Sequence, residues 1–204
     1  MTGVLSGQSY RTIVLKGACV PPTAEQGHEV RQRLLAAAVE LIPERGWTAV
    51  STRVLADRAG VSPSVVHYHF ASVTALLNEA VVTTMRAVLE QATAFLDTAR
   101  TPDEVVDALI GAVDQYSGAD PMSLLFVEAY LAGTRDEDLH RQLGAVVDTL
   151  RGRLADWFTV HAVPEPAQTA AVLAAAIDGI LLHRGLGAGL TGEASAKVLR
   201  RLVS

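Results

Sequence analysis

The chain has 204 residues, of which 50% are hydrophobic and 19% are charged, and this balance excludes disorder through most of its length. Aromatic residues make up only 5%, and the apolar residues are mostly Ala, Val and Leu, which favours packed helices over a β-sandwich. Residues 1–72 hold seven Lys and Arg against five Asp and Glu, whereas residues 73–204 hold ten against seventeen. This division hints at an N-terminal part that faces a polyanion and a separate acidic body.

Cysteine occurs once, at Cys19, so neither an intrachain disulfide nor a cysteine-based zinc site can form. A reducing, cytoplasmic setting fits this composition, and a lone thiol is more often incidental than a redox sensor. The longest apolar run covers residues 170–177 and stops at Asp178, short of the 18 or so apolar residues of a membrane helix. We therefore expect no membrane span.

Helical periodicity begins near Glu29, and we expect residues 1–27 to be a flexible extension outside the fold. The apolar residues of the first helix recur at spacings of three and four: Leu34, Leu35, Ala38, Leu41 and Ile42. Gly46 is a natural stop, because glycine tolerates the left-handed conformation that ends many helices. Pro43 removes one backbone hydrogen bond and should kink the last turn.

Two brief helices follow. Ser51 or Thr52 can cap the first, the Gly60-Val61 pair breaks it, and Ser62 caps the second, with proline at its first position. Ser72 then caps a long helix over residues 73–99.

Further helical segments are expected at 102–117, 121–132, 136–161, 165–187 and 192–203, between breaks rich in Gly and Pro. No segment alternates with the period of a strand. We therefore predict an all-α fold of about nine helices, with a helix-turn-helix domain over residues 28–72 and a second helical domain over residues 73–204.

The spacing of Ala56 and Gly60 suits a helix-turn-helix, which needs a small residue where its helices cross and a turn residue that tolerates positive φ. An ordinary helical hairpin with a glycine turn would show the same pair. The cap at Ser62, the polar second helix and the preceding amphipathic helix favour DNA binding instead.

Residues 29–80 resemble the DNA-binding region of the tetracycline-repressor (TetR) family of bacterial transcriptional regulators. The resemblance rests on the following segments: Glu44-Arg45-Gly46-Trp47, Ser51-Thr52-Arg53, Leu55-Ala56, Ala59-Gly60-Val61-Ser62 and His67-Tyr68-His69-Phe70-Ala71-Ser72. Carried over by position, it implies DNA contacts from Thr52, Arg53, Ser62, Ser64, Val65, His67, Tyr68, His69 and Ser72. Hydroxyl and imidazole groups can donate to phosphate oxygens, and a valine can touch a thymine methyl group.

Two positions depart from the family pattern. Val73 stands where the family usually has a lysine that pairs with phosphate, and His67 replaces the usual tyrosine. Both changes weaken backbone contacts, so DNA affinity should depend on salt and also on pH, since histidines gain charge as pH falls. His67 and His69 point away from each other on a helix, so they cannot share a metal ion.

The resemblance also implies that the second domain binds a small molecule and dimerises. Candidate ligand-lining residues are the larger side chains of the central helices: Met85, Leu89, Phe95, Tyr116, Met122, Phe126, Tyr130 and Trp157. Each of them taken singly is more often plain core than a ligand contact. The segment 172–182 is apolar nearly all round and must be buried on both sides, which a second subunit explains better than an intramolecular core. The expected dimer interface comprises Val172, Ala176, Gly179, Leu182, Val198 and Leu202.

The function expected is that of a homodimeric regulator, released from a palindromic operator by a small-molecule effector. A helical enzyme or carrier would need a convergent polar constellation, and the sequence offers no metal-ligand pair, phosphate loop or nucleophile motif. We therefore expect no catalytic residues, cofactor or metal. A third reading is a helical dimer that has lost DNA binding and acts through protein partners.

Overall fold

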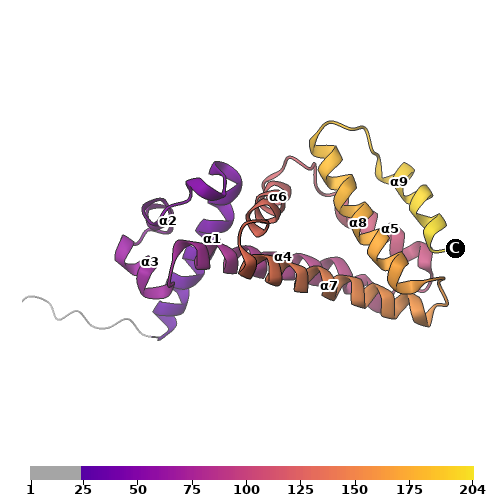
Figure 1. Cartoon of the computed structure of the whole chain (residues 1–204), viewed down its shortest axis with the longest axis horizontal. Helices are drawn as coiled ribbons and strands as arrows, with labels where there is room; N and C mark the ends of the chain where they lie inside the picture. Colours follow the sequence, from indigo (N-terminus) through magenta and orange to yellow (C-terminus); the bar gives the residue numbers. More distant parts are fainter. Residues whose placement is uncertain (1–23) are drawn as a thin grey trace, which may run out of the picture.

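The computed structural model describes residues 24–204, and this part of the chain is all-α (Figure 1). The N-terminal helices are α1 (Ala24–Arg45), the short 3-10 segment η1 (Trp47–Ala49), α2 (Thr52–Ala59) and α3 (Pro63–His69). They are followed by α4 (Val73–Thr93), η2 (Ala94–Asp97), α5 (Pro102–Val113), α6 (Pro121–Gly133), α7 (Glu137–Val160), α8 (Pro166–Gly185), α9 (Gly192–Leu199) and η3 (Arg200–Leu202). The predicted fold class is confirmed.

Several element boundaries differ from those expected; the helix expected over 102–117, for example, ends at Val113. Helix α1 already begins at Ala24, so residues 24–27 belong to it rather than to an extension; Cys19 lies outside the described residues. The helix expected over 73–99 ends at Thr93 and tightens into η2. Likewise the last helix ends at Leu199 and gives way to η3. Pro43 lies inside α1, which continues to Arg45 before Gly46 takes φ +82°.

The N-terminal core joins α1, α2, α3 and the first half of α4. All five expected apolar residues of α1 are buried, and Leu55 and Val66 of the next two helices pack against them. Leu125 and Ala129 of α6 belong to the same cluster, and both are 0% exposed. Helix α6 therefore reaches out of the C-terminal half of the chain and completes the core of the N-terminal domain.

Helices α4 and α7 lie side by side and run parallel (Figure 1). Three contacts fix their register: Asn78 donates to Asp136, Arg153 donates to Thr93, and the Trp157 indole donates to the Leu96 carbonyl. Beyond them, α5, α8 and α9 close a second core around Val105, Phe158 and Leu173, which are all 0% exposed.

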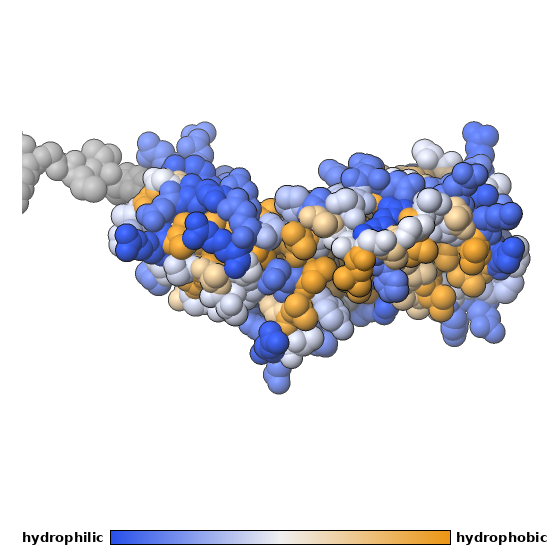
Figure 2. Space-filling model, turned by 90° about the horizontal axis from the view of Figure 1, so that it is seen from above, coloured by the Kyte–Doolittle hydropathy of each residue, from blue (hydrophilic) through white to orange (hydrophobic). Residues whose placement is uncertain are grey.

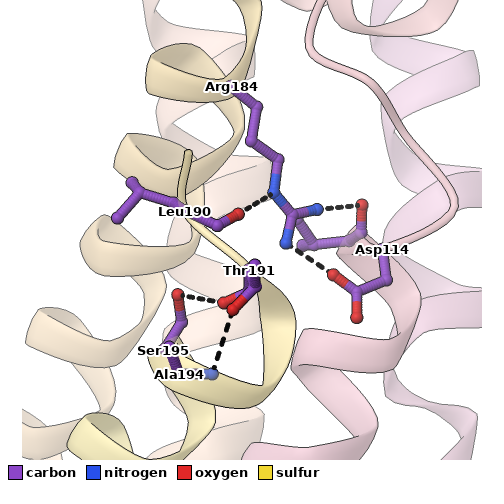
Figure 3. A network of polar contacts seen from close by, with 7 residues as sticks. Asp114, Arg184, Leu190, Thr191, Ala194 and Ser195 are labelled. Carbon is purple, nitrogen blue, oxygen red and sulfur yellow. Dashed lines mark hydrogen bonds and ion pairs between the residues drawn. The ribbon is translucent and has the colours of Figure 1, made fainter. Parts of the chain in front are cut away.

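Arg184 ties the far end of the C-terminal domain together (Figure 3). Its guanidinium donates to the Val113 carbonyl at 3.1 Å, to the Asp114 carboxylate at 2.5 Å and to the Leu190 carbonyl at 3.1 Å. One α8 side chain thus holds both the end of α5 and the loop that leads into α9. Close by, Gly118 has φ +81°, and a Cβ there would lie 2.3 Å from the backbone nitrogen of Gly185, so the two segments touch through their main chains.

By length and mean hydropathy, α8 is long and apolar enough to cross a membrane, although we expected no such helix from the sequence. Asp178 ends the uninterrupted apolar run, whereas the helix as a whole remains apolar. Ala170, Leu173 and Ile180 of α8 pack into the C-terminal core, and α8 lies along α7. Helix α8 therefore packs one face into the C-terminal core and leaves other apolar side chains exposed, Val172 and Leu182 among them.

Candidate nucleic-acid interface

The turn between α2 and α3 has the geometry that the sequence predicted, except that Ser62 precedes α3 without the expected side-chain capping bond. The Ser51 hydroxyl caps α2 by accepting from the Val54 N–H, and Gly60 ends that helix in the left-handed region at φ +67°. The Val61 N–H then bonds back to the Ala56 carbonyl at 3.0 Å, which fixes the angle at which α3 departs.

Helix α3 is anchored from one side and polar on the other. Val66 is 1% exposed and holds the helix on the N-terminal core, whereas the Tyr68 side chain is 77% exposed. Ser62, Ser64 and His67 are also exposed, and the two serine hydroxyls lie 2.9 Å apart. A helix held in this way presents its polar side chains to a partner outside the protein.

The nine expected DNA-contacting residues all lie outside the core. Thr52 and Arg53 open α2, and Ser72 caps α4 by accepting from the Ala75 N–H. Val65 and His69 are half-buried, and the His69 ring meets the Tyr68 ring edge-on at 5.0 Å. Their contacts with DNA stay a prediction.

Most arginines of the N-terminal domain are already engaged inside it. Arg58 pairs with Glu40 and Glu44 of α1 at 2.8 and 2.6 Å, and its hydrogen bond to Glu44 lowers the pKa of that carboxyl. Arg31 pairs with Glu79 at 2.6 Å and lies over the Phe70 ring.

Arg33 is also engaged within the domain, because it donates to the backbone carbonyl of Ala59. In contrast, the Arg53 side chain is 88% exposed and lies 4.0 Å from Asp57. Arg53 is therefore the α2 cation best placed to meet a phosphate.

A contact between α6 and the end of α1 links the two halves of the chain. The Trp47 N–H donates to the Glu128 carboxylate at 2.9 Å, beside the tight turn at Gly46. The sequence showed Glu128 only as a polar residue in apolar surroundings. Nothing in the local pattern of α6 indicates a partner 81 positions earlier in the chain.

The eight candidate ligand-lining residues do not gather around one described cavity. Met122 packs against the N-terminal core, Phe95 and Trp157 against the C-terminal core, and Met85 against both the N-terminal core and a small cluster between α4 and α7. Tyr130 is 71% exposed. The other candidates from α5–α6 are half-buried: Tyr116 and Phe126. Leu89 is the one of the eight that lines a groove of about 280 Å³ between α4 and α7.

The residues expected at a dimer interface lie on the surface of this single chain. Val172 and Leu182 of α8 are 53% and 50% exposed, and Val198 of α9 is 57% exposed. Leu202 is 39% exposed, whereas Ala176 and Gly179 are half-buried. Figure 2 shows hydrophobic side chains gathered on the face of the C-terminal domain and hydrophilic ones over the N-terminal end.

A helix-turn-helix with an exposed polar second helix, joined to a larger helical domain, defines a DNA-binding regulator. Two family models match the chain: "Bacterial regulatory proteins, tetR family" over residues 34–80 and "Tetracyclin repressor-like, C-terminal domain" over residues 100–204. The chain belongs to the TetR family of transcriptional regulators, and it is a regulator rather than an enzyme.

Individual proteins support the assignment. The HTH-type transcriptional regulator BetI of Rhizobium meliloti (strain 1021) is 30% identical over 85% of this chain and 87% of its own length. The crystal structure of a transcriptional regulator from Streptomyces coelicolor A3(2) is 28% identical and superposes with a TM-score of 0.72, over 86% of this chain and 99% of that one. The multidrug binding protein EbrR, in complex with imidazole, is 26% identical with a TM-score of 0.67, over 85% and 94% of the two chains.

Proposed function

We propose that this protein is a homodimeric cytoplasmic repressor that leaves a near-palindromic operator when a small molecule binds its C-terminal domain. The observation that carries the proposal is helix α3, which Val66 fixes to the core while Ser64, His67 and Tyr68 remain exposed. Two such helices in one dimer would enter successive major grooves about 34–36 Å apart. The similarity to EbrR, a multidrug binding protein, supports a small-molecule effector.

The contribution of α6 to the N-terminal core supports a direct route from effector to DNA. A ligand that favours one position of α6 must also favour one position of α1, because Leu125 and Ala129 pack in the α1 core. The coupling is reciprocal, so operator DNA would weaken effector binding by the same factor.

DNA binding is tested by fluorescence anisotropy on the intergenic DNA upstream of the gene, against scrambled DNA, at two salt concentrations. The double variant Ser64→Ala, Tyr68→Ala should lose specific binding, because both side chains are exposed and their removal leaves the core intact. Tyr130→Ala is the matched control, since Tyr130 is 71% exposed on α6. Equal weak binding to both DNAs, lost at modest salt, would contradict the operator proposal and favour a dimer that acts through protein partners.

The homodimer is tested by sedimentation of two matched variants. Leu182→Glu places a charge on the exposed apolar surface at the C-terminal end of α8 and should yield monomers. Val160→Glu changes an 81% exposed valine at the end of α7 and should leave the dimer intact. A wild-type chain that sediments as a monomer would refute the dimer.

A further inference from the structure

The groove between α4 and α7 has a composition that no role described above explains. It is about 280 Å³ in volume, near the lower end of the range for small-molecule sites. Its apolar lining comes from Leu89 of α4 and from Val146 and Leu150 of α7. Arg86, Glu90 and Arg153 supply its charged side chains.

Arg153 is held in place by a buried hydroxyl. Thr93 is 1% exposed, and its hydroxyl donates to the Leu89 carbonyl at 2.7 Å. The oxygen of that hydroxyl in turn accepts a hydrogen bond from Arg153 at 2.5 Å. Only one of the guanidinium N–H groups is used in this contact, and Arg153 forms no ion pair within residues 24–204. Arg153 is otherwise an exposed residue, so its remaining donors are accessible, and a guanidinium can bind a carboxylate through two parallel hydrogen bonds.

The remaining charges of the groove leave it positive. Arg86 has no carboxylate partner in the described part of the chain, and Glu90 is the one acidic residue of the lining. The positive charge stands out because the domain as a whole is acidic, with seventeen Asp and Glu against ten Lys and Arg. A bound cation would be repelled by two arginines, whereas a bound anion would be repelled by one glutamate.

The length of the groove sets the size of its occupant. Arg86 and Thr93 are seven residues apart on one helix, which corresponds to about 10 Å along the axis. Leu89, Val146 and Leu150 offer an apolar surface to a chain of that length.

We propose that this groove binds an amphipathic monocarboxylate of medium chain length. The carboxylate engages Arg153, and the hydrocarbon chain lies along the apolar lining toward Arg86. The role of the groove as effector site rests on the function proposed above, whereas its binding of a carboxylate does not.

The test is calorimetric titration of the full-length protein with two probes that share a chain length and differ in the charge of the headgroup: decanoate and decyltrimethylammonium, both below micelle-forming concentrations. Wild type should bind decanoate in preference to the cation. Arg153→Gln should weaken decanoate binding about tenfold or more, since it removes a charge-assisted pair. Arg135→Gln, which changes an exposed arginine outside the groove, should leave the affinity unchanged.

Glu90→Gln shows whether the groove prefers an anion or a cation. It removes the one negative charge of the lining and should tighten decanoate binding, whereas a cation site would bind its ligand less tightly after the same change. Equal binding of the two probes, or a decanoate affinity that Arg153→Gln does not alter, would overturn the proposal. Circular dichroism of each variant establishes that it is folded.

DNA release is measured separately by adding decanoate to the protein–operator complex. Release that Arg153→Gln abolishes supports the groove as the effector site. Calorimetric binding without release leaves the carboxylate site standing and overturns its role as effector site. Failure of the wild-type protein to bind any operator refutes the proposed function instead, and the calorimetric result is unaffected by it.

Discussion

The hydrogen bond between Glu128 and the Trp47 N–H gives the sharpest test of how α6 is joined to the N-terminal domain. Glu128→Ala removes the acceptor and leaves the backbone N–H of Trp47, the first residue of η1, without its partner. A hydrogen bond to a charged group contributes about 1.5–3 kcal/mol. Because Glu128 is only half-buried, we expect the lower end of that range, about 1.5 kcal/mol.

For a chain of this size, that loss corresponds to a fall in Tm of about 3–6 °C. Glu128→Gln keeps an acceptor oxygen and loses the charge, so its loss should be about half as large. Urea unfolding followed by tryptophan fluorescence measures both, in a Trp157→Phe background where Trp47 is the remaining tryptophan.

Asp156→Ala, on the exposed surface of α7, serves as the control for removal of a carboxylate. If Glu128→Ala unfolds at the wild-type urea concentration and leaves the Trp47 emission unchanged, the contact does not link α6 to α1. Any coupling between the C-terminal domain and α1 would then depend on the apolar contacts of α6 alone.

Three further predictions concern the backbone, pH and salt. Gly118→Ala should lower the stability of the fold by several kcal/mol in thermal unfolding, because Gly118 has positive φ and its new Cβ would overlap the α8 backbone. Gly144→Ala is the control: its Cβ would meet no atom within 4 Å, so the change should be neutral or stabilising. The Leu139 N–H holds the pKa of Asp136 below its ordinary value, so this carboxylate stabilises the fold at neutral pH and the contribution is lost as pH falls through the lowered pKa. Asp136→Asn, which keeps a capping oxygen, should therefore lose less stability on acidification than wild type in urea unfolding at each pH; equal losses would contradict this. Arg53→Gln should reduce the salt dependence of operator binding, measured by anisotropy, by about one counterion, because Arg53 is exposed. Arg58→Gln should instead lower the stability of the N-terminal domain in unfolding assays, because Arg58 is paired with Glu40 and Glu44. The reverse result would refute the assignment of the two arginines.

Helix starts were predictable where a capping residue marks them. Ser51 and Ser72 each accept a hydrogen bond from the backbone three residues later, as the sequence predicted, whereas the expected cap at Ser62 makes no such bond and α1 begins earlier than expected, at Ala24. Helix ends were less predictable. Thr93 is the last residue of α4, and its hydroxyl accepts from Arg153, which is 60 residues away in the sequence, so no local pattern indicates this contact.

The two candidate sites also differ in how well the sequence predicts them. The exposed face of α3 could be read from the pattern around Ser62 and Tyr68, since a short amphipathic helix has one obvious inner side. The groove between α4 and α7 could not, because its charged side chains come from two helices whose register is set by tertiary contacts. Helix α6 is apolar on most of its circumference, so its sequence does not say which core it enters.

The place of α6 in the N-terminal core bears on how DNA-binding heads can be exchanged among relatives. A chimera cut between Ser72 and Val73 would separate α1 from Leu125 and Ala129, and each new head would meet a foreign α6 surface. A graft that preserves packing has to carry two discontinuous pieces, α1 through the first half of α4 together with α6. The unit of exchange in this protein is therefore defined by its core and not by a cut in the sequence.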